Sequence, residues 1–134
     1  MTFMRADHPA AGEELTLARF LALDHIVVSI TGVGPAPVDE TLAAMGRMRR
    51  VKVRAPNFFA AMEIAARSDL VATLPESLTK VTATIGQFVS QPPPLPLDDV
   101  PMSLAWHARH QNAPRHAWLR GMIVAAARDV SWVG

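Results

Sequence analysis

The sequence predicts an α/β fold with a mainly parallel sheet, and three observations lead to this expectation. Short runs rich in β-branched residues alternate along the chain with segments of helical periodicity. The expected order (helix, strand, helix, strand, helix, strand, helix) is typical of right-handed crossover units. Half of the 134 residues are apolar, which is enough for one buried core.

The first helix and strand are expected near the start of the chain. Residues 15–23 are predicted to be helical because Thr16 is a favourable N-cap. Residues 25–30 (HIVVSI) are short and β-branched, which is typical of a buried strand. Residues 32–37 contain two glycines and two prolines and are therefore expected to form a loop.

A second helix and strand are expected next. Asp39 and Glu40 favour the positive end of a helix over residues 39–49, and residues 51–55 alternate with period two, as a half-exposed strand does. Basic side chains run through this region: Arg47, Arg49, Arg50, Lys52 and Arg54. We interpret them as a helix C-terminus and the solvated face of an edge strand, with a nucleic-acid patch as the alternative.

A third helix, a third strand and a fourth helix complete this part. Asn57 is expected to cap a helix over residues 58–68. Residues 70–74 are predicted to be a short strand. Pro75 suits the first turn of a helix that continues to residue 85.

The C-terminal part differs in composition. Residues 91–99 (QPPPLPLDD) contain four prolines and predict an extended connector. Residues 100–107 are predicted to be a strand, and Pro114 to begin a helix that ends near Asp129. One face of this helix is apolar: Trp118, Leu119, Met122, Ile123 and Ala126. We interpret it as core, which must pack either on the first part or on elements outside this sequence.

Several short motifs occur in a specific order. They are RADHP (5–9), DHIVV (24–28), RAPNF (54–58), SDLVATLP (68–75), WHAR (106–109), Pro114 and WLR (118–120). In this order and spacing, over roughly residues 3–127, the chain resembles the late part of the effector-binding domain of LysR-type transcriptional regulators. The resemblance would place the strand over residues 51–55 and the helix after it near a dimer contact.

The resemblance implies a type 2 periplasmic-binding-protein-like α/β fold, with two subdomains around a cleft. Residues 1–90 would be a nearly complete second subdomain, and residues 91–99 the connector. Residues 100–134 would be the returning strand and helix of the first subdomain. The winged helix-turn-helix lies outside this sequence, so no direct DNA contact is expected from this chain.

Candidate effector-binding residues follow the ends of the predicted strands, where open α/β sheets bind ligands. Hydroxyls and free N–H groups there can hold a carboxylate, and an aromatic side chain can form an apolar wall. The candidates are Ser29, Ile30, Thr31, Gly32, Asn57, Phe58, Thr73, Leu74 and Pro75. Taken singly, each is also explained by capping or turn formation, and the resemblance favours a site for the region as a whole.

Other functions have less support. A net charge of +1 offers no bulk attraction to phosphate, and the absence of cysteine excludes thiolate metal sites. His107 and His110 lie near the expected strand end, and His107 is expected to make a structural hydrogen bond. Nucleophile, P-loop and dinucleotide motifs are absent, so we expect no enzyme, metal or cofactor. A charged N-terminus and short apolar runs predict a cytoplasmic protein without membrane contact.

The leading hypothesis is a regulatory domain that binds a small organic molecule, an aromatic or a carboxylate, between two subdomains and shifts their arrangement. A homodimer or higher homo-oligomer is expected, because pairing would cover an open sheet edge. A transport-type solute-binding protein and a small α/β enzyme are the alternatives from other classes.

Overall fold

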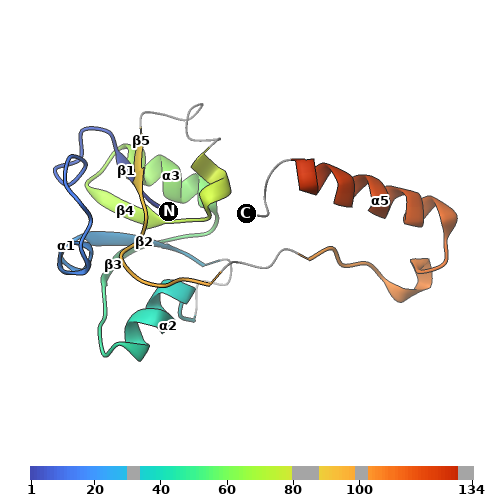
Figure 1. Cartoon of the computed structure of the whole chain (residues 1–134), viewed down its shortest axis with the longest axis horizontal. Coiled ribbons are helices and arrows are strands. Elements are labelled where there is room, and N and C mark those ends of the chain that lie inside the picture. Colours follow the sequence, from blue (N-terminus) through green and yellow to red (C-terminus); the bar gives the residue numbers. More distant parts are fainter. Residues whose placement is uncertain (30–33, 80–87, 99–102, 130–134) are drawn as a thin grey trace. The chain divides into compact units, whose positions relative to one another are not determined.

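The computed structural model describes residues 1–29, 34–79, 88–98 and 103–129, and it separates into two units (Figure 1). Unit 1 comprises Met1–Asp98 and contains the sheet. Unit 2 comprises Asp99–Gly134 and contains one long helix. Each unit makes its own set of internal contacts and is described by itself.

Unit 1 is built on a five-stranded sheet with strand order β3-β2-β4-β1-β5. The strands are β1 Thr2–Arg5, β2 Asp24–Val28, β3 Arg50–Ala55, β4 Leu70–Thr73 and β5 Phe88–Gln91. β2 pairs in parallel with β3 and β4, as predicted. β1 pairs antiparallel with β4 and β5, so the sheet is mixed and contains two strands that the sequence pattern did not predict.

Within the described residues of unit 1, three α-helices accompany the sheet: α1 Leu17–Ala22, α2 Pro37–Ala44 and α3 Phe58–Ala66. The predicted caps are confirmed, because Thr16 Oγ1 accepts a hydrogen bond from the Arg19 N–H and Asn57 Oδ1 accepts one from the Ala60 N–H. After Pro75 the structure has a 3₁₀ turn over Glu76–Leu78. The predicted fourth helix continues to residue 85, and its residues 80–85 lie outside the described residues.

The prediction for α2 was wrong at its C-terminal end. The helix stops at Ala44, five residues early, because Gly46 adopts a positive φ of 65°. The Gly46 N–H donates to the Ala43 carbonyl and the Arg47 N–H donates to the Leu42 carbonyl, which is the Schellman arrangement that ends helices. The arginines after Gly46 therefore do not lie at the helix terminus.

Two apolar clusters fill unit 1. The α3 cluster contains Phe3, Ile26, Ala55, Ala61, Met62, Ala65, Ala72, Leu74 and Leu78. The α1–α2 cluster contains Leu15, Phe20, Val38, Leu42 and Leu95. The proline-rich segment thus contributes a core residue, since Leu95 is only 8% exposed. Gln91 also anchors this segment, because its Oε1 accepts a hydrogen bond from the Leu15 N–H at 3.1 Å.

Replacing Leu95 with alanine is expected to lower the free energy of unfolding of unit 1 by about 2–3 kcal/mol, because it leaves a cavity in the α1–α2 cluster. Urea denaturation followed by far-ultraviolet circular dichroism measures the change. The neighbouring Asp98→Ala variant is the control, because Asp98 is exposed. Equal midpoints for the two variants would contradict the packing of Leu95.

Unit 2 contains a 3₁₀ turn over Ala108–His110 and helix α5, Pro114–Asp129. The strand predicted over residues 100–107 was wrong in its described part, because residues 103–107 form none. A strand is defined by hydrogen bonds to a neighbouring strand, and the described part of unit 2 supplies no such neighbour.

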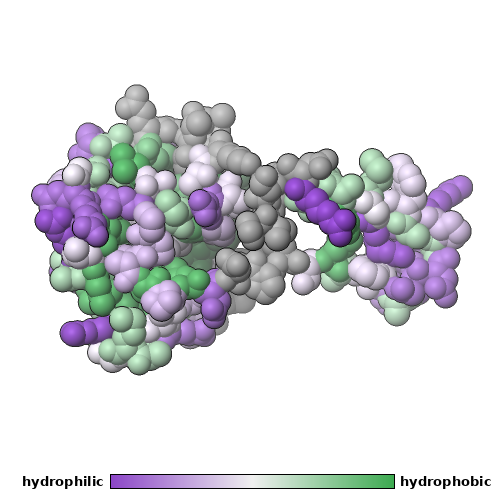
Figure 2. All heavy atoms as spheres, in the orientation of Figure 1, coloured by the Kyte–Doolittle hydropathy of each residue, from purple (hydrophilic) through white to green (hydrophobic). Residues whose placement is uncertain are grey.

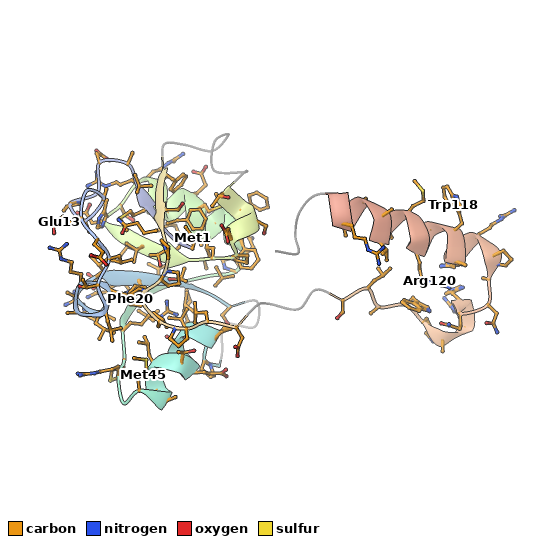
Figure 3. All side chains as sticks on the ribbon, viewed as in Figure 1. Met1, Glu13, Phe20, Met45, Trp118 and Arg120 are labelled. Carbon is orange, nitrogen blue, oxygen red and sulfur yellow. The ribbon has the colours of Figure 1, made fainter. Side chains whose placement is uncertain are left out.

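Helix α5 is bound to the segment before it through Arg120 (Figure 3). Its guanidinium lies 4.6 Å from the centre of the Trp106 ring and donates to the carbonyls of His110 and Gln111 at 3.1 and 3.0 Å. The Trp106 Nε1–H donates to Gln111 Oε1 at 2.7 Å. The Arg120 side chain therefore fixes the preceding turn against the helix.

The apolar stripe of α5 is exposed within unit 2, so the core packing expected for it stays a prediction. Trp118 is 68% exposed and Met122 is 53% exposed. Figure 2 shows apolar side chains at the surface of this unit beside hydrophilic ones. Since such a stripe is normally buried, the burial partner of α5 is not supplied by the described residues of unit 2.

Candidate functional site

Two of the predicted candidate segments meet beside the ends of β2 and β3. The Ser29 N–H donates to the Ala55 carbonyl at 3.0 Å, so the residue after β2 lies against the last residue of β3. Asn57 and Phe58 follow β3 directly. The other candidates after β2, which are Ile30, Thr31 and Gly32, lie outside the described residues.

The N-terminus of α3 presents an aromatic surface. Asn57 Oδ1 is occupied as a cap, since it accepts from the Ala60 N–H at 2.9 Å. Phe58 is 41% exposed and Phe59 is 58% exposed. The geometry thus gives the Asn57 side-chain oxygen Oδ1 a structural role and leaves the Phe58 ring accessible to a ligand.

The candidates after β4 are held mainly by β1. Thr73 Oγ1 lies 3.2 Å from Thr2 Oγ1, and the Leu74 N–H donates to the Met1 carbonyl at 2.9 Å. The Leu74 side chain belongs to the α3 cluster and is 4% exposed. Leu74 can therefore only position its neighbours, Thr73 and Pro75, which are both partly exposed.

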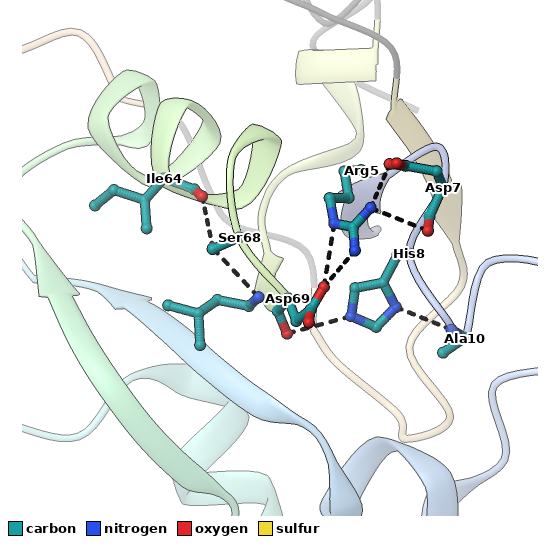
Figure 4. Close-up of polar contacts among 8 residues, drawn as sticks. Arg5, Asp7, His8, Ala10, Ile64, Ser68 and Asp69 are labelled. Carbon is teal, nitrogen blue, oxygen red and sulfur yellow. Dashed lines mark hydrogen bonds and ion pairs between the residues drawn. The ribbon is translucent and has the colours of Figure 1, made fainter.

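The RADHP motif, residues 5–9, has a structural role, because its side chains connect separate segments of unit 1 (Figure 4). Arg5 donates from Nε and Nη2 to Asp69 Oδ1 at 3.1 and 2.5 Å, and from Nη1 to the Asp7 carbonyl at 3.0 Å. The side-chain hydrogen bond from Arg5 also lowers the pKa of Asp7 below its ordinary value. These contacts join the end of β1 to the turn before β4.

His8 completes this connection and is 5% exposed. Its Nδ1 accepts from the Ala10 N–H at 3.0 Å, so the proton of a neutral ring is on Nε2, which lies 3.2 Å from the Asp69 carbonyl oxygen. Ser68 Oγ, on the same turn, donates to the Ile64 carbonyl at 2.7 Å. The motif is therefore a structural clamp.

Two arginines of the basic run make ion pairs within the part of the chain that the structure describes. Arg49 Nε donates to Asp39 Oδ1 at 2.7 Å, and Arg50 Nε donates to Asp24 Oδ1 at 2.6 Å. Burial opposes ionisation of Asp39, but the hydrogen bonds from Arg49 and from the Ala36 N–H outweigh it, so the pKa of Asp39 is lowered. The remaining members, Arg47, Lys52 and Arg54, are exposed.

The histidines of unit 2 have structural contacts. His107 Nδ1 accepts from the Arg109 N–H at 3.1 Å, as expected, and the His110 and His116 rings stack at 4.0 Å. In the ranges that the structure describes, His, Cys, Asp and Glu form no group of three or more that could hold a metal ion. Among the same residues, no helix has the length and apolar character to cross a membrane.

Comparison with known proteins extends these observations. The family model "LysR substrate binding domain" matches residues 1–128. The transcriptional activators NagR of Ralstonia sp and NahR of Pseudomonas putida are each 32% identical to the chain, over 120 and 119 residues. These matches cover 90% and 89% of the chain, which spans about 40% of the length of either relative.

Solved structures of transcriptional regulators are similar to this chain in fold. The regulatory domain of MexT, a transcriptional activator in Pseudomonas aeruginosa, superposes with a TM-score of 0.76 at 32% identity. A transcriptional regulator from Vibrio parahaemolyticus gives 0.81 at 25% identity. The matches cover 91% and 96% of this chain and 60% of each of those chains.

The fold and its neighbours define the type 2 periplasmic-binding-protein-like class of LysR regulatory domains. The chain belongs to the LysR substrate-binding domain family.

Proposed function

We propose that this domain senses a small organic molecule, an aromatic or a carboxylate, and controls transcription as part of a longer LysR-type regulator. The observation that carries the proposal is the accessible Phe58 ring beside the joined ends of β2 and β3. An aromatic wall next to backbone N–H groups suits a flat, anionic effector. Ser29, Ile30, Thr31, Gly32, Asn57, Phe58, Thr73 and Pro75 would surround it, with Leu74 as support.

The proposed domain organisation assigns residues 1–90 to the second subdomain, residues 91–99 to the connector and residues 100–134 to the first subdomain. Three features of unit 2 support this division: the exposed stripe of α5, the absence of a strand at 103–107, and a groove of about 440 Å³. Leu104, Trp106 and Val124 line this groove. A sheet from a more complete first subdomain would cover the stripe and the groove, and it would supply the neighbouring strand that residues 103–107 need in order to form a strand themselves.

Within that longer protein, effector binding between the subdomains would shift their arrangement and so move the paired DNA-binding domains. The operator would be contacted by a winged helix-turn-helix and not by this chain. We propose a cytoplasmic homodimer or higher homo-oligomer, without enzymatic activity and without a cofactor or membrane contact. The regulatory role of the relatives supports this assignment.

A thermal-shift screen of the longer protein, with benzoate as the first probe and amino acids as further probes, tests the proposal. A genuine effector raises Tm, and the stabilisation grows with the logarithm of its concentration once that exceeds Kd. Replacing Phe58 with alanine is expected to raise Kd about tenfold, which corresponds to about 1.4 kcal/mol. Phe59→Ala is the matched control, because it removes a neighbouring exposed ring. If no compound stabilises the protein, or if both variants bind equally well, the proposed site is wrong.

A further inference from the structure

A groove of about 400 Å³ lies between α2 and the edge strand β3 in unit 1. Its cationic lining residues are Arg47, Arg49 and Arg54. Its apolar lining is aliphatic and comprises Pro35, Ala43, Met48 and Val51. The volume is within the range of small-molecule sites in proteins.

The charges in this groove are not balanced. Its carboxylate, Asp39, is already engaged by Arg49 Nε at 2.7 Å and by the Ala36 N–H at 3.1 Å. In unit 1, the described ion pairs also occupy Arg5, Arg19, Arg50 and Arg67. In unit 1, Arg47 and Arg54 are the two arginines with no ion pair to a carboxylate among the described residues, and both line the groove. Arg54 also interacts electrostatically with Asp39, which Arg49 already engages. Two guanidinium groups therefore remain available to an anion.

Two departures from regular structure build the groove. The early end of α2 at Gly46 directs Arg47 and Met48 toward β3 and not along the helix. In addition, β3 carries a bulge opposite β2, since His25 pairs with Val51 while Ile26 pairs with Val53. Residues three apart on a regular strand face opposite sides of the sheet, but the bulge lets Val51 and Arg54 line the same groove.

An ion pair between Arg49 and Asp39 holds the two walls of the groove together. The Arg49 side chain is only 2% exposed and is fixed by Asp39 in the first turn of α2. This contact joins the start of the helix to the segment that precedes β3. The two walls are therefore held at a set separation before any ligand binds, which reduces the entropic cost of binding.

We propose that this groove binds a small aliphatic carboxylate. Guanidinium groups match the geometry of a carboxylate, and the aliphatic lining favours an apolar chain over a fully hydrated ion such as phosphate. Met48 is 84% exposed, and its flexible thioether can fold over such a chain. The inference does not depend on the proposed strand-end site, because it uses none of that site's residues.

Titration of the ¹⁵N-labelled chain with hexanoate, followed by backbone amide chemical shifts, tests the proposal. Saturable shifts are expected in α2, at residues 46–49 and in β3. The double variant Arg47→Gln/Arg54→Gln should raise Kd at least tenfold, whereas Arg67→Gln, which removes the arginine that follows α3, should leave Kd unchanged. Raising NaCl from about 50 mM to about 500 mM should weaken hexanoate binding to the unmodified chain, because salt screens exposed charges.

Two ligand controls separate the contribution of the carboxylate charge from that of the apolar chain. Hexanamide has the same chain without the charge, and inorganic phosphate has the charge without the chain, so both should bind at least tenfold more weakly. Equal binding of hexanamide would show an apolar contact alone, and equal binding of phosphate would show a charge effect alone. Either result, or the absence of saturable shifts around the groove, would overturn the proposal while leaving the strand-end site untouched.

Discussion

Replacing Phe20 with alanine is expected to lower the free energy of unfolding of unit 1 by about 3–5 kcal/mol. The Phe20 side chain is completely buried in the α1–α2 cluster, where Leu15, Leu42 and Leu95 come from three separate segments. Its ring centre also lies 4.5 Å from that of His25. Truncation would leave a cavity that these elements cannot close without moving apart, and a domain of this size has only about 5–15 kcal/mol of stability.

Chemical denaturation followed by far-ultraviolet circular dichroism measures this effect. Phe59→Ala is the matched control, because it deletes the same side chain from a position that is 58% exposed. The control should change the free energy of unfolding by less than about 1 kcal/mol. Similar losses in the two variants would mean that Phe20 does not hold the cluster together.

The second large effect concerns pH and His25. This side chain is fully buried, and burial lowers its pKa from 6.5 to about 4. Its Nε2 lies 2.8 Å from the Phe20 carbonyl oxygen, which a neutral ring satisfies by donating from Nε2. Its Nδ1 is buried and has no hydrogen-bond partner among the described residues. Protonation would add a charge and an unsatisfied donor at this atom.

The direction of the pH effect follows from which state binds the proton. The unfolded chain takes up a proton on His25 as the pH falls below 6.5, whereas the folded chain resists until about pH 4. Stability from His25 is therefore complete above pH 6.5 and is lost between pH 6.5 and about 4. A pKa difference of one corresponds to about 1.4 kcal/mol, so the total loss is about 3 kcal/mol.

Denaturation curves at pH 7, 6, 5 and 4 measure this loss. His25→Leu should flatten the profile within that interval, whereas His116→Leu, on the surface of unit 2, should leave it unchanged. The lowered pKa of Asp39 acts in a separate interval, because stability from this carboxylate is lost only as the pH falls below its ordinary value of 3.8. A His25→Leu profile as steep as that of the unmodified chain would contradict the assignment.

Local signals in the sequence predicted the elements that local interactions form. Thr16 and Asn57 cap the helices that they were expected to cap, and the β-branched run after Asp24 is the central strand β2. Strands β1 and β5 carry no comparable signal, because their pairing depends on partners far away in the sequence. Their positions followed only from the complete sheet.

In the candidate site, too, some features were predictable from the sequence and others depend on pairing between distant segments. The predicted parallel pairing brings the end of β2 beside the end of β3, where the Ser29 N–H donates to the Ala55 carbonyl, because parallel strands end at one edge of a sheet. The sequence did not reveal that Thr73 faces Thr2, since β1 was not predicted. The groove beside β3 was also missed, because the bulge opposite β2 and the early end of α2 have no strong pattern in the sequence.

The place of β1 between β4 and β5 determines when this sheet can close during synthesis. Among the strands of the sheet β1 leaves the ribosome first, yet Thr2 pairs with Thr73 and Gln91. The parallel strands β2, β3 and β4 can assemble earlier through their short crossovers. At about 5–20 residues per second, β1 waits roughly 5–15 seconds for both partners. During that interval the nascent chain exposes β1 without a strand partner, and this is the stage at which chaperone protection matters most.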